Sequence, residues 1–308
     1  MPSSFPPLSR VSFRHSFRLG TPSYVYPADI LPNVEALAPY VDDIELVLFE
    51  SGKTDDGRRT TDDRGEEEKQ TPNIQRRTPN VQCLKTEDSF SNIPSAATIA
   101  RLAELARQHD LTYTVHFPID RHLGSPDAGE RRALQKQMLA IMDRTRPLTP
   151  FAYVLHLEGV VRDSDRGRVK TWQNDIAGLL PALIERAGDP ALLCVENLNY
   201  PFAWCEPLLD TFGLGVCIDL GHLWVGGDNV ETHLQRHLPR TRVIHLHGAR
   251  DGRDHLALTA MAPDRLRQLM NSIDKFTGVL TLEIFNYEGI RDSLAVLSEF
   301  WDRKPEEP

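Results

Sequence analysis

Short apolar runs alternate with longer amphipathic segments along this chain of 308 residues, and that alternation limits the fold more than any other feature. The runs are rich in Val, Ile, Tyr and Thr, and their lengths suit strands buried on both faces. They cover residues 17–24, 43–49, 111–117, 151–157, 191–197, 213–219, 241–247 and 278–284. The segments between and after them are expected to be helices, at 29–40, 94–109, 128–146, 168–187, 201–211, 228–237, 262–274 and 290–302.

Strict alternation of strands and helices predicts an α/β fold in which parallel strands close into a single (β/α)8 barrel, a TIM barrel. An open, doubly wound sheet is the alternative, but no Gly-x-Gly-x-x-Gly follows the first strand. We expect one barrel domain at 17–308, preceded by a flexible tail at 1–16. A highly charged stretch from about 52 to 90 interrupts that domain after the second strand.

The stretch at 52–90 is dense in charge, Thr, Pro, Gly and Gln and nearly empty of large aliphatic residues. Such a composition cannot bury enough surface to offset the entropy lost on ordering. The sequence therefore predicts a disordered insertion, which is more simply a tolerated surface loop than a regulatory element.

The charge balance and the cysteines limit the partners and the compartment. Lys and Arg total 35 against 44 for Asp and Glu, a net charge of −9, which argues against nucleic acid as a partner. No apolar window of membrane-spanning length occurs, and the N-terminus lacks the apolar core of a secretory signal. The 4 cysteines lack Cys-x-x-Cys spacing. Free thiols and a cytoplasmic location are the expected consequence.

Side chains that commonly bind metals end consecutive predicted strands, from the third to the eighth. These residues are His116, His156, Glu196, Asp219, His245 and Glu283. Two further histidines are near, because His222 follows Asp219 by three residues and His247 shares the strand of His245. The carboxyl ends of the strands of a TIM barrel converge on one mouth, where active sites lie. We therefore expect these side chains to meet there.

The residues two positions before each strand-end residue support an inward orientation, since residues two apart in a strand share a face. They are small or β-branched and uncharged: Thr114, Val154, Cys194, Cys217, Val243 and Thr281. Cys194 and Cys217 are thus expected to pack one layer below the site rather than to bind a metal. Glu45, on the parity of Val47 and Phe49, could also face the interior; its role is left open by the sequence.

Each strand-end residue has a structural interpretation on its own, as a hydrogen-bonded core histidine or a partner in an ion pair. Together in one cavity, these imidazoles and carboxylates would repel one another or stay unsatisfied without a cation. Imidazole with carboxylate and without thiolate suits Zn²⁺, Mn²⁺ or Fe²⁺. The number of ligands favours two ions bridged by a carboxylate, which is the usual basis of two-metal hydrolysis.

These residues resemble the xylose-isomerase-like TIM barrels, and within them the apurinic/apyrimidinic endonucleases with a multinuclear zinc site. The stretches that carry the resemblance are VENLNY (195–200), GVCIDLGHLWVGGDN (215–229), VIHLHG (243–248) and LTLEIFN (280–286). It implies that one ion is held by His116, His156 and Glu196. It also implies that Glu196 bridges to a second ion, held with Asp219, His245 and Glu283.

A third metal subsite in that branch uses the histidine after the sixth strand and an Asp-x-His in the following loop. His222 matches the first of these, and His255 is a match for the last. Arg253 stands where the aspartate would be, so the resemblance leaves a third ion open.

A narrower resemblance is to the cobamide-remodelling phosphodiesterases. The stretches that carry it are 20–34, 42–51, 92–105, 111–120 and 242–256. It implies a metal-dependent phosphodiesterase that hydrolyses the nucleotide loop of a corrinoid of the coenzyme B12 type. The products would be cobinamide phosphate and the lower-ligand nucleoside, as a step of corrinoid salvage or remodelling. The expected catalytic carboxylates are Glu196, Asp219 and Glu283.

A corrinoid is large and nearly planar, so its binding calls for apolar or aromatic surface around the mouth. Rings that follow the predicted strands are candidates: Tyr24, Tyr26, Phe117, Tyr200, Phe202, Trp204, Trp224, Phe285 and Tyr287. His247 is a further candidate contact to substrate.

Other functions stay open from the sequence alone. A sugar isomerase or epimerase on this barrel needs one divalent ion, and the pair of His116 and His156 disfavours it. A DNA-repair endonuclease is disfavoured by the acidic composition. A corrinoid-binding module without catalysis would not need so many metal ligands, so the metal content of the purified protein would discriminate.

Overall fold

The computed structural model describes Leu8 and residues 15–48 and 93–302. Within them, parallel strands close into a barrel in the order β1-β10-β7-β6-β5-β4-β3-β2. The barrel strands are β1 Arg18–Pro22, β2 Asp43–Val47, β3 Thr112–His116, β4 Ala152–Leu155, β5 Leu193–Glu196, β6 Gly215–Asp219, β7 Thr241–Leu246 and β10 Val279–Leu282. Each lies inside one of the predicted runs, so the predicted TIM barrel is confirmed.

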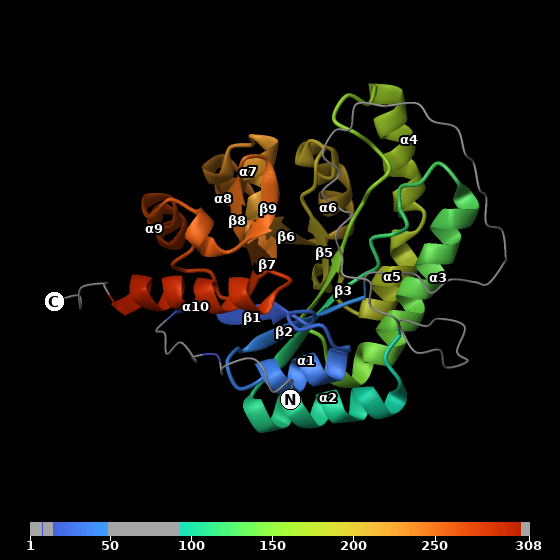
Figure 1. The fold of residues 1–308 in the computed structure, drawn as a ribbon. Coiled ribbons are helices and arrows are strands. Elements are labelled where there is room, and N and C mark those ends of the chain that lie inside the picture. The colour runs from blue at the N-terminus through green and yellow to red at the C-terminus, as the bar shows by residue number, and fades with distance from the viewer. Residues whose placement is uncertain (1–7, 9–14, 49–92, 303–308) are drawn as a thin grey trace, which may run out of the picture.

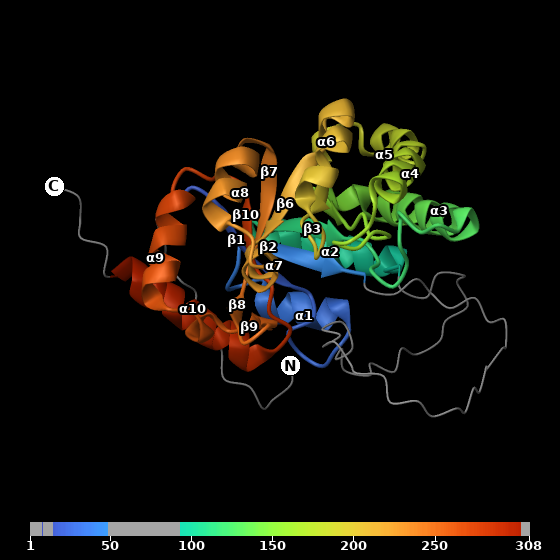
Figure 2. The same ribbon diagram turned by 90° about the horizontal axis from the view of Figure 1, so that it is seen from above.

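Helices surround the strands on all sides, as the two views in Figures 1 and 2 show. They are α1 Ile30–Leu37, α2 Ala96–His109, α3 Ala128–Thr145, α4 Arg166–Ala177, α5 Leu180–Ala187, α6 Glu206–Phe212, α7 Leu220–Gly226, α8 Val230–His237, α9 Pro263–Ser272 and α10 Tyr287–Asp302. Polar residues fix several starts: the side chain of Ser95 accepts from Thr98 N at the start of α2, and that of Asp165 accepts from Arg168 N at the start of α4.

Three local predictions need correction. The single helix expected at 168–187 is two helices, α4 and α5, because Pro181 has no amide hydrogen to continue a helix and its ring would clash with the preceding turn. No helix was expected between the predicted strand at 213–219 and the predicted helix at 228–237, but the short helix α7 lies there, directly after β6. A hairpin of β8 Gly248–Arg250 and β9 Arg253–Leu256 follows β7, where the sequence predicted a loop.

The buried residues form two separate clusters. The larger one fills the layer between the strands and the helices, and includes Leu102, Trp172 and Leu209. The smaller one lies inside the barrel and comprises Ala152, Val154, Cys194, Cys217 and Val243. The inward orientation predicted for these positions from strand parity agrees with this second cluster.

Most of the predicted tail at 1–16, the predicted insertion at 52–90 and Cys83 lie outside the described residues. Two described residues of the tail contact the barrel: Leu8 is 5% exposed within the larger cluster, and Ser16 Oγ donates to Phe276 O at 2.6 Å. Beyond these contacts, the flexible tail at 1–16 stays a prediction. Among the described residues, no helix is both long enough and apolar enough to cross a bilayer.

Candidate metal centre

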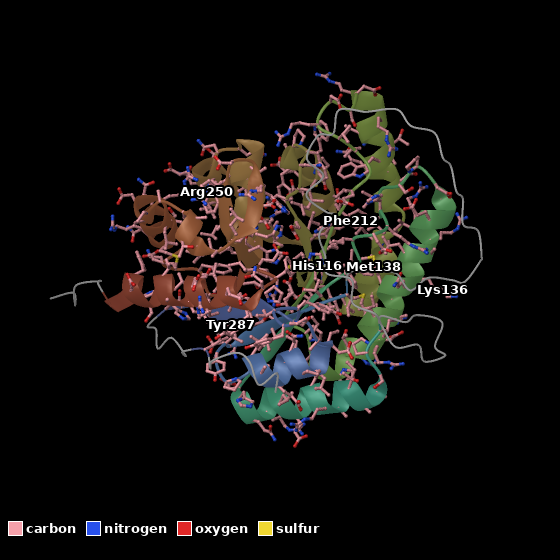
Figure 3. All side chains as sticks on the ribbon, viewed as in Figure 1. His116, Lys136, Met138, Phe212, Arg250 and Tyr287 are labelled. Atoms are coloured by element: carbon pink, nitrogen blue, oxygen red, sulfur yellow. The ribbon has the colours of Figure 1, made fainter. Side chains whose placement is uncertain are left out.

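The strand-end residues predicted from the sequence lie together at the carboxyl ends of the barrel strands. His116, Glu196 and Asp219 are the last residues of β3, β5 and β6, and His156 and Glu283 directly follow β4 and β10. His245 is in β7. All these side chains are buried or nearly so. Figure 3 labels His116 near the middle of the molecule.

His116, His156 and Glu196 form a first cluster. Glu196 Oε2 lies 3.3 Å from His116 Nε2 and 3.1 Å from His156 Nε2. The two imidazole rings meet edge to face, with centroids 4.9 Å apart. One ligand atom from each of the three residues lies within 4.8 Å of the others, so the group could hold one divalent cation.

A second cluster contains Asp219, His247, His255 and Glu283. His247 Nε2 lies 3.0 Å from Asp219 Oδ2, and His255 Nε2 lies 3.3 Å from Glu283 Oε2. The structure thus places His247 and His255, both named from the sequence as candidates for a third ion or for substrate, beside two of the carboxylates that the resemblance assigns to a second ion. Gly221 makes room for the ring of His247, since a Cβ at position 221 would lie 1.8 Å from its Cε1.

His245 lies between the two clusters and is fully buried. Its Nδ1 is 3.2 Å from Glu283 Oε2, 3.7 Å from Asp219 Oδ2 and 3.8 Å from Glu196 Oε2. Its Nε2 is 2.9 Å from Glu45 Oε2. The ligand set predicted for the second ion is therefore gathered around one nitrogen of this ring.

Hydrogen bonds at the end of β6 hold Asp219 in place. Asp219 caps α7, because its Oδ1 accepts from His222 N at 2.6 Å. The side chain of Asn197 accepts from Asp219 N and donates to Asp219 O, both at 2.8 Å. The carboxylate is thereby fixed between β5 and β7 before any ligand binds.

His222 and the β8–β9 hairpin form the more open side of the site. The side chains of His222 and His255 are 22% and 25% exposed. Asp254 lies between them, with Oδ1 3.0 Å from His255 Nδ1 and Oδ2 3.8 Å from His222 Nε2. The Asp-x-His pattern placed this aspartate at position 253, which is Arg253, whereas the structure has it one residue later, at Asp254.

The carboxylates and histidines shift one another's pKa values strongly. Burial would raise the pKa of Glu283, but the charges of His245 and His255 lower it to about 2. Burial opposes the charged form of His116, yet its hydrogen bond to Glu196 and the nearby carboxylates raise its pKa to about 9. The site therefore demands positive charge, which protons or metal cations can supply.

Residues 81–300 match the profile of a family described as xylose isomerase-like TIM barrel. The chain belongs to this family. A comparison with curated proteins finds no match.

Solved structures share the fold of this xylose isomerase-like barrel over nearly its whole length. A D-tagatose 3-epimerase-like protein is 17% identical, with 93% of this chain and 97% of that chain covered and a TM-score of 0.64. The IOLI protein with a binding zinc atom is 13% identical, with 93% and 99% covered and a TM-score of 0.62. Endonuclease IV from Thermus thermophilus is 16% identical, with 92% and 99% covered and a TM-score of 0.58.

The hydrogen bonds of the histidines show which ring nitrogens carry protons, and therefore whether the side chains of this site suit a metal ion. Several rings use one nitrogen to donate to an oxygen outside the ring of carboxylates. These bonds are His116 Nδ1 to Phe117 O at 2.8 Å, His222 Nδ1 to Asn197 O at 3.1 Å, His245 Nε2 to Glu45 Oε2 at 2.9 Å and His255 Nδ1 to Asp254 Oδ1 at 3.0 Å.

In a neutral ring, the other nitrogen then carries a lone pair. For His116, His245 and His255 that nitrogen faces a carboxylate, an arrangement that is repulsive unless a proton or a cation lies between. Within the described part of the chain, His245 Nδ1 and Glu283 Oε2 are buried without a hydrogen-bond partner. The donor set therefore fits divalent cations held by imidazole and carboxylate.

The cysteines beneath the site keep the packing role predicted for them. Cys194 and Cys217 are fully buried members of the cluster inside the barrel. Burial raises the pKa of Cys194 to about 12 and that of Cys217 well above its usual range, so both thiols stay protonated. Cys217 offers a ligand atom within 4.8 Å of those of Glu196 and His245, but its side chain packs in the apolar cluster one layer below the site.

Most of the aromatic rings expected at the mouth serve packing instead. Phe117 is 2% exposed and stacks on Tyr153, and Tyr200 is 1% exposed. Trp224, a predicted substrate contact, lies under the guanidinium of Arg265 in α9, with its ring centroid 5.6 Å from Arg265 Cζ. The half-buried ring of Trp224 also packs against the larger cluster, and its contact with substrate stays a prediction.

Four of the predicted rings are only partly buried, namely Tyr24, Trp204, Trp224 and Phe285. The ring of Phe285 lies 5.4 Å from that of His255, beside the second cluster. Tyr24 follows β1 and is half-buried against the larger cluster. The expected broad aromatic platform is therefore reduced to a few side chains in the described residues.

Proposed function

We propose that this chain is a metal-dependent phosphodiesterase. The observation that carries the proposal is the position of Glu196 between two groups of ligands. Its Oε2 faces His116 and His156 and lies 3.8 Å from Nδ1 of His245, a nitrogen that also approaches Asp219 and Glu283. A carboxylate shared by two groups of ligands suits a bridge between two ions.

The residues would divide as follows. His116, His156 and Glu196 would hold one ion, and Glu196, Asp219, His245 and Glu283 would hold the other. When bound, divalent ions here would neutralise the charge on the phosphate oxygens and favour deprotonation of an attacking water.

The two partly exposed histidines would handle the substrate. Neighbouring carboxylates raise the pKa of His222, and the charge of Glu283 raises that of His255 well above its usual range, in both cases against the effect of burial. The raised pKa values favour the protonated rings, which can donate to the phosphate or to the oxygen that leaves. Asp254 lies between them and orients the ring of His255.

The substrate class we propose is a corrinoid whose nucleotide loop contains the phosphodiester. The support is the resemblance of five stretches of sequence, from 20–34 to 242–256, to the cobamide-remodelling phosphodiesterases. A single phosphate on a large, mostly uncharged molecule also suits a chain with a net charge of −9 better than a long polyanion does. Water would add to phosphorus and the bond to the ribose oxygen would break, giving cobinamide phosphate and the nucleoside.

A sugar epimerase is the second candidate. Its support is that the D-tagatose 3-epimerase-like protein covers 93% of this chain and that the cluster around Asp219 and Glu283 could hold a single ion. The nearby pair of His116 and His156 is not needed for that chemistry. An apurinic/apyrimidinic endonuclease is the third, and the acidic composition weighs against it.

A competition between substrates separates these candidates. The protein, loaded with Zn²⁺ or Mn²⁺, is incubated with adenosylcobalamin, with an abasic-site oligonucleotide and with a ketohexose, and the products are separated by chromatography and weighed by mass spectrometry. We expect cobinamide phosphate and the free nucleoside, and neither product in the presence of excess chelator. Cleavage of the oligonucleotide alone, or epimerisation alone, would replace the proposal with the corresponding candidate.

A further inference from the structure

Glu45 lies inside the barrel directly against the metal centre, and none of the roles described so far uses it. It is the middle residue of β2 and is fully buried, as is His245, its partner from β7. Glu45 Oε2 lies 2.9 Å from His245 Nε2, the shortest contact that this ring makes with a carboxylate. A buried carboxylate is costly unless a specific interaction requires it.

The contact with Glu45 decides which nitrogen of His245 can bind a cation. A neutral imidazole carries one proton, on either Nδ1 or Nε2. A proton on Nε2 donates to Glu45 and leaves the lone pair of Nδ1 directed at Glu283, Asp219 and Glu196. A proton on Nδ1 would instead direct the lone pair of Nε2 at the carboxylate of Glu45, which is repulsive. Glu45 therefore favours the form in which Nδ1 is the free ligand.

In His247, two residues further along the same stretch, Nε2 and not Nδ1 faces the carboxylates of the site. Its Nδ1 accepts a hydrogen bond from the backbone N–H of His255 at 2.8 Å. Its proton then lies on Nε2, which donates to Asp219 at 3.0 Å. In this neutral form His247 supports the carboxylate of Asp219 and presents no lone pair to a cation. The two histidines of the His-Leu-His sequence thus differ in the partner of the nitrogen that points away from the site. That partner is the Glu45 carboxylate for His245 and the backbone N–H of His255 for His247.

We propose that Glu45 is a positioning residue for the metal centre: it holds His245 as the Nε2–H tautomer, so that Nδ1 binds the cation that Asp219 and Glu283 share. A carboxylate that accepts from a metal-binding histidine fixes the orientation of the ring and makes the ligand more basic. This inference rests on the metal centre proposed above and adds a residue from β2 to it.

Zinc affinity tests the proposal. The dissociation constant for Zn²⁺ is measured by competition with a chromophoric chelator for the full-length protein and for Glu45→Gln. Loss of a carboxylate partner behind a metal-binding histidine weakens metal binding by about 10–100-fold, and we expect that range here. The matched control is Asp43→Asn, which removes another fully buried carboxylate two residues earlier in the same strand. We expect its zinc affinity to equal that of the wild type.

Nuclear magnetic resonance tests the tautomer without relying on the Glu45 variant to fold. Long-range ¹H–¹⁵N spectra of the zinc-loaded wild-type protein report which ring nitrogen carries the proton, and the signals of His245 are those lost in His245→Gln. We expect a proton on Nε2 and a zinc-shifted Nδ1. A proton on Nδ1 would overturn the proposal, whatever the variants do.

The outcomes separate this proposal from the proposed function. If the wild-type protein binds no divalent cation, both fail. If Glu45→Gln binds zinc as tightly as the wild type, the positioning role fails and the metal centre stands. An equal loss in Asp43→Asn and Glu45→Gln would assign the effect to general disturbance of the barrel interior and would also overturn the role of Glu45.

Discussion

Below the metal centre, the two halves of the barrel interior differ in chemistry. Strands β4 to β7 contribute an apolar half, made of Ala152, Val154, Cys194, Cys217 and Val243. Strands β2, β3 and β10 contribute a polar half, made of Asp43, Glu45, Thr114 and Thr281, all fully buried. Both halves support residues of the metal centre at the strand ends, so packing alone does not require the polar one.

The polar half is costly to the fold. Asp43 Oδ1, Glu45 Oε1 and Thr281 Oγ1 are buried without hydrogen-bond partners among the described residues. Each such atom costs about 1–3 kcal/mol relative to a satisfied one. The apolar half has no comparable cost. The contrast indicates that stability is sacrificed on the side where Glu45 contacts His245, and not on the side where Glu196 and Asp219 are anchored by other means.

The strongest way to break this contrast is to remove a ligand above the apolar half. We expect Glu196→Gln to lose both ions, because the neutral amide leaves His116 and His156 without their shared carboxylate. Loss of several kcal/mol of charge stabilisation corresponds to a fall in turnover of about a thousand-fold or more. Metal content by mass spectrometry and turnover of adenosylcobalamin check it.

The control for that change is Glu206→Gln in α6, which removes a carboxylate that pairs with Arg236 on the outside of the barrel. It should retain the metals and the turnover. Since Glu45 only positions a ligand, Glu45→Gln should lose much less metal affinity than Glu196→Gln. Equal losses would mean that the polar half contributes a ligand of its own.

Asp43 gives the polar half a pH-dependent cost. Burial raises its pKa from 3.8 to about 6. A carboxyl with a raised pKa in the folded state stabilises the fold below about pH 4 relative to higher pH, and this stability is lost as the pH rises through about 6. The shift of roughly two units corresponds to about 3 kcal/mol.

Asp43→Asn should therefore be more stable than the wild type at pH 8, by up to about 3 kcal/mol, and the difference should shrink towards pH 4. The amide keeps an oxygen to accept from Thr112 Oγ1, which lies 2.6 Å from Asp43 Oδ2. Urea denaturation at both pH values measures it, with Asp210→Asn on the surface as the control. A difference that does not change with pH would mean that Asp43 has the same pKa in the folded and unfolded states, and would contradict the raised pKa.

The barrel could be predicted from the sequence because each strand is a short apolar run between turns, and all the barrel strands fall in such runs. The errors lie where local chemistry overrides that pattern. Pro181 divides one predicted helix into α4 and α5. The β8–β9 hairpin turns at Asp251 and Gly252, both with positive φ, and an Asp-Gly pair is a turn signal that the sequence prediction did not use.

The candidate site was predicted in part. Position at a strand end identified the residues from His116 to Glu283, because all barrel strands point their carboxyl ends to one mouth. Asp254 and His255 depend on the hairpin, so their places could not be derived from strand ends. Glu45 is in the middle of a strand, and its contact with His245 joins residues that are 200 positions apart. That contact follows from barrel closure, which strand parity alone does not specify.

The smallest expected effects on the free energy of unfolding come from replacing a hydroxyl by a methyl group in the polar half, and a methyl group by a hydroxyl in the apolar half. Thr281→Val replaces a buried hydroxyl that has no partner among the described residues with an apolar group of the same shape, so we expect stability to rise by about 1 kcal/mol. Val154→Thr places a hydroxyl in the apolar half, where burial without a partner costs about 1–3 kcal/mol. Urea denaturation of both variants and of the wild type at one pH gives the two differences.

The signs of these two differences decide the comparison. Opposite signs mean that the polar side chains lower the stability of the fold and are present for another reason. If Thr281→Val instead lowers stability, its hydroxyl has a partner in solution, such as a buried water that also reaches Asp43 or Glu45. In that case the double variant of Thr281→Val with Asp43→Asn would show less than the sum of the single effects, because both changes would remove bonds to the same water. Additive effects would place the two side chains in separate environments and leave Glu45 as the one polar group in that half with a role in the metal centre.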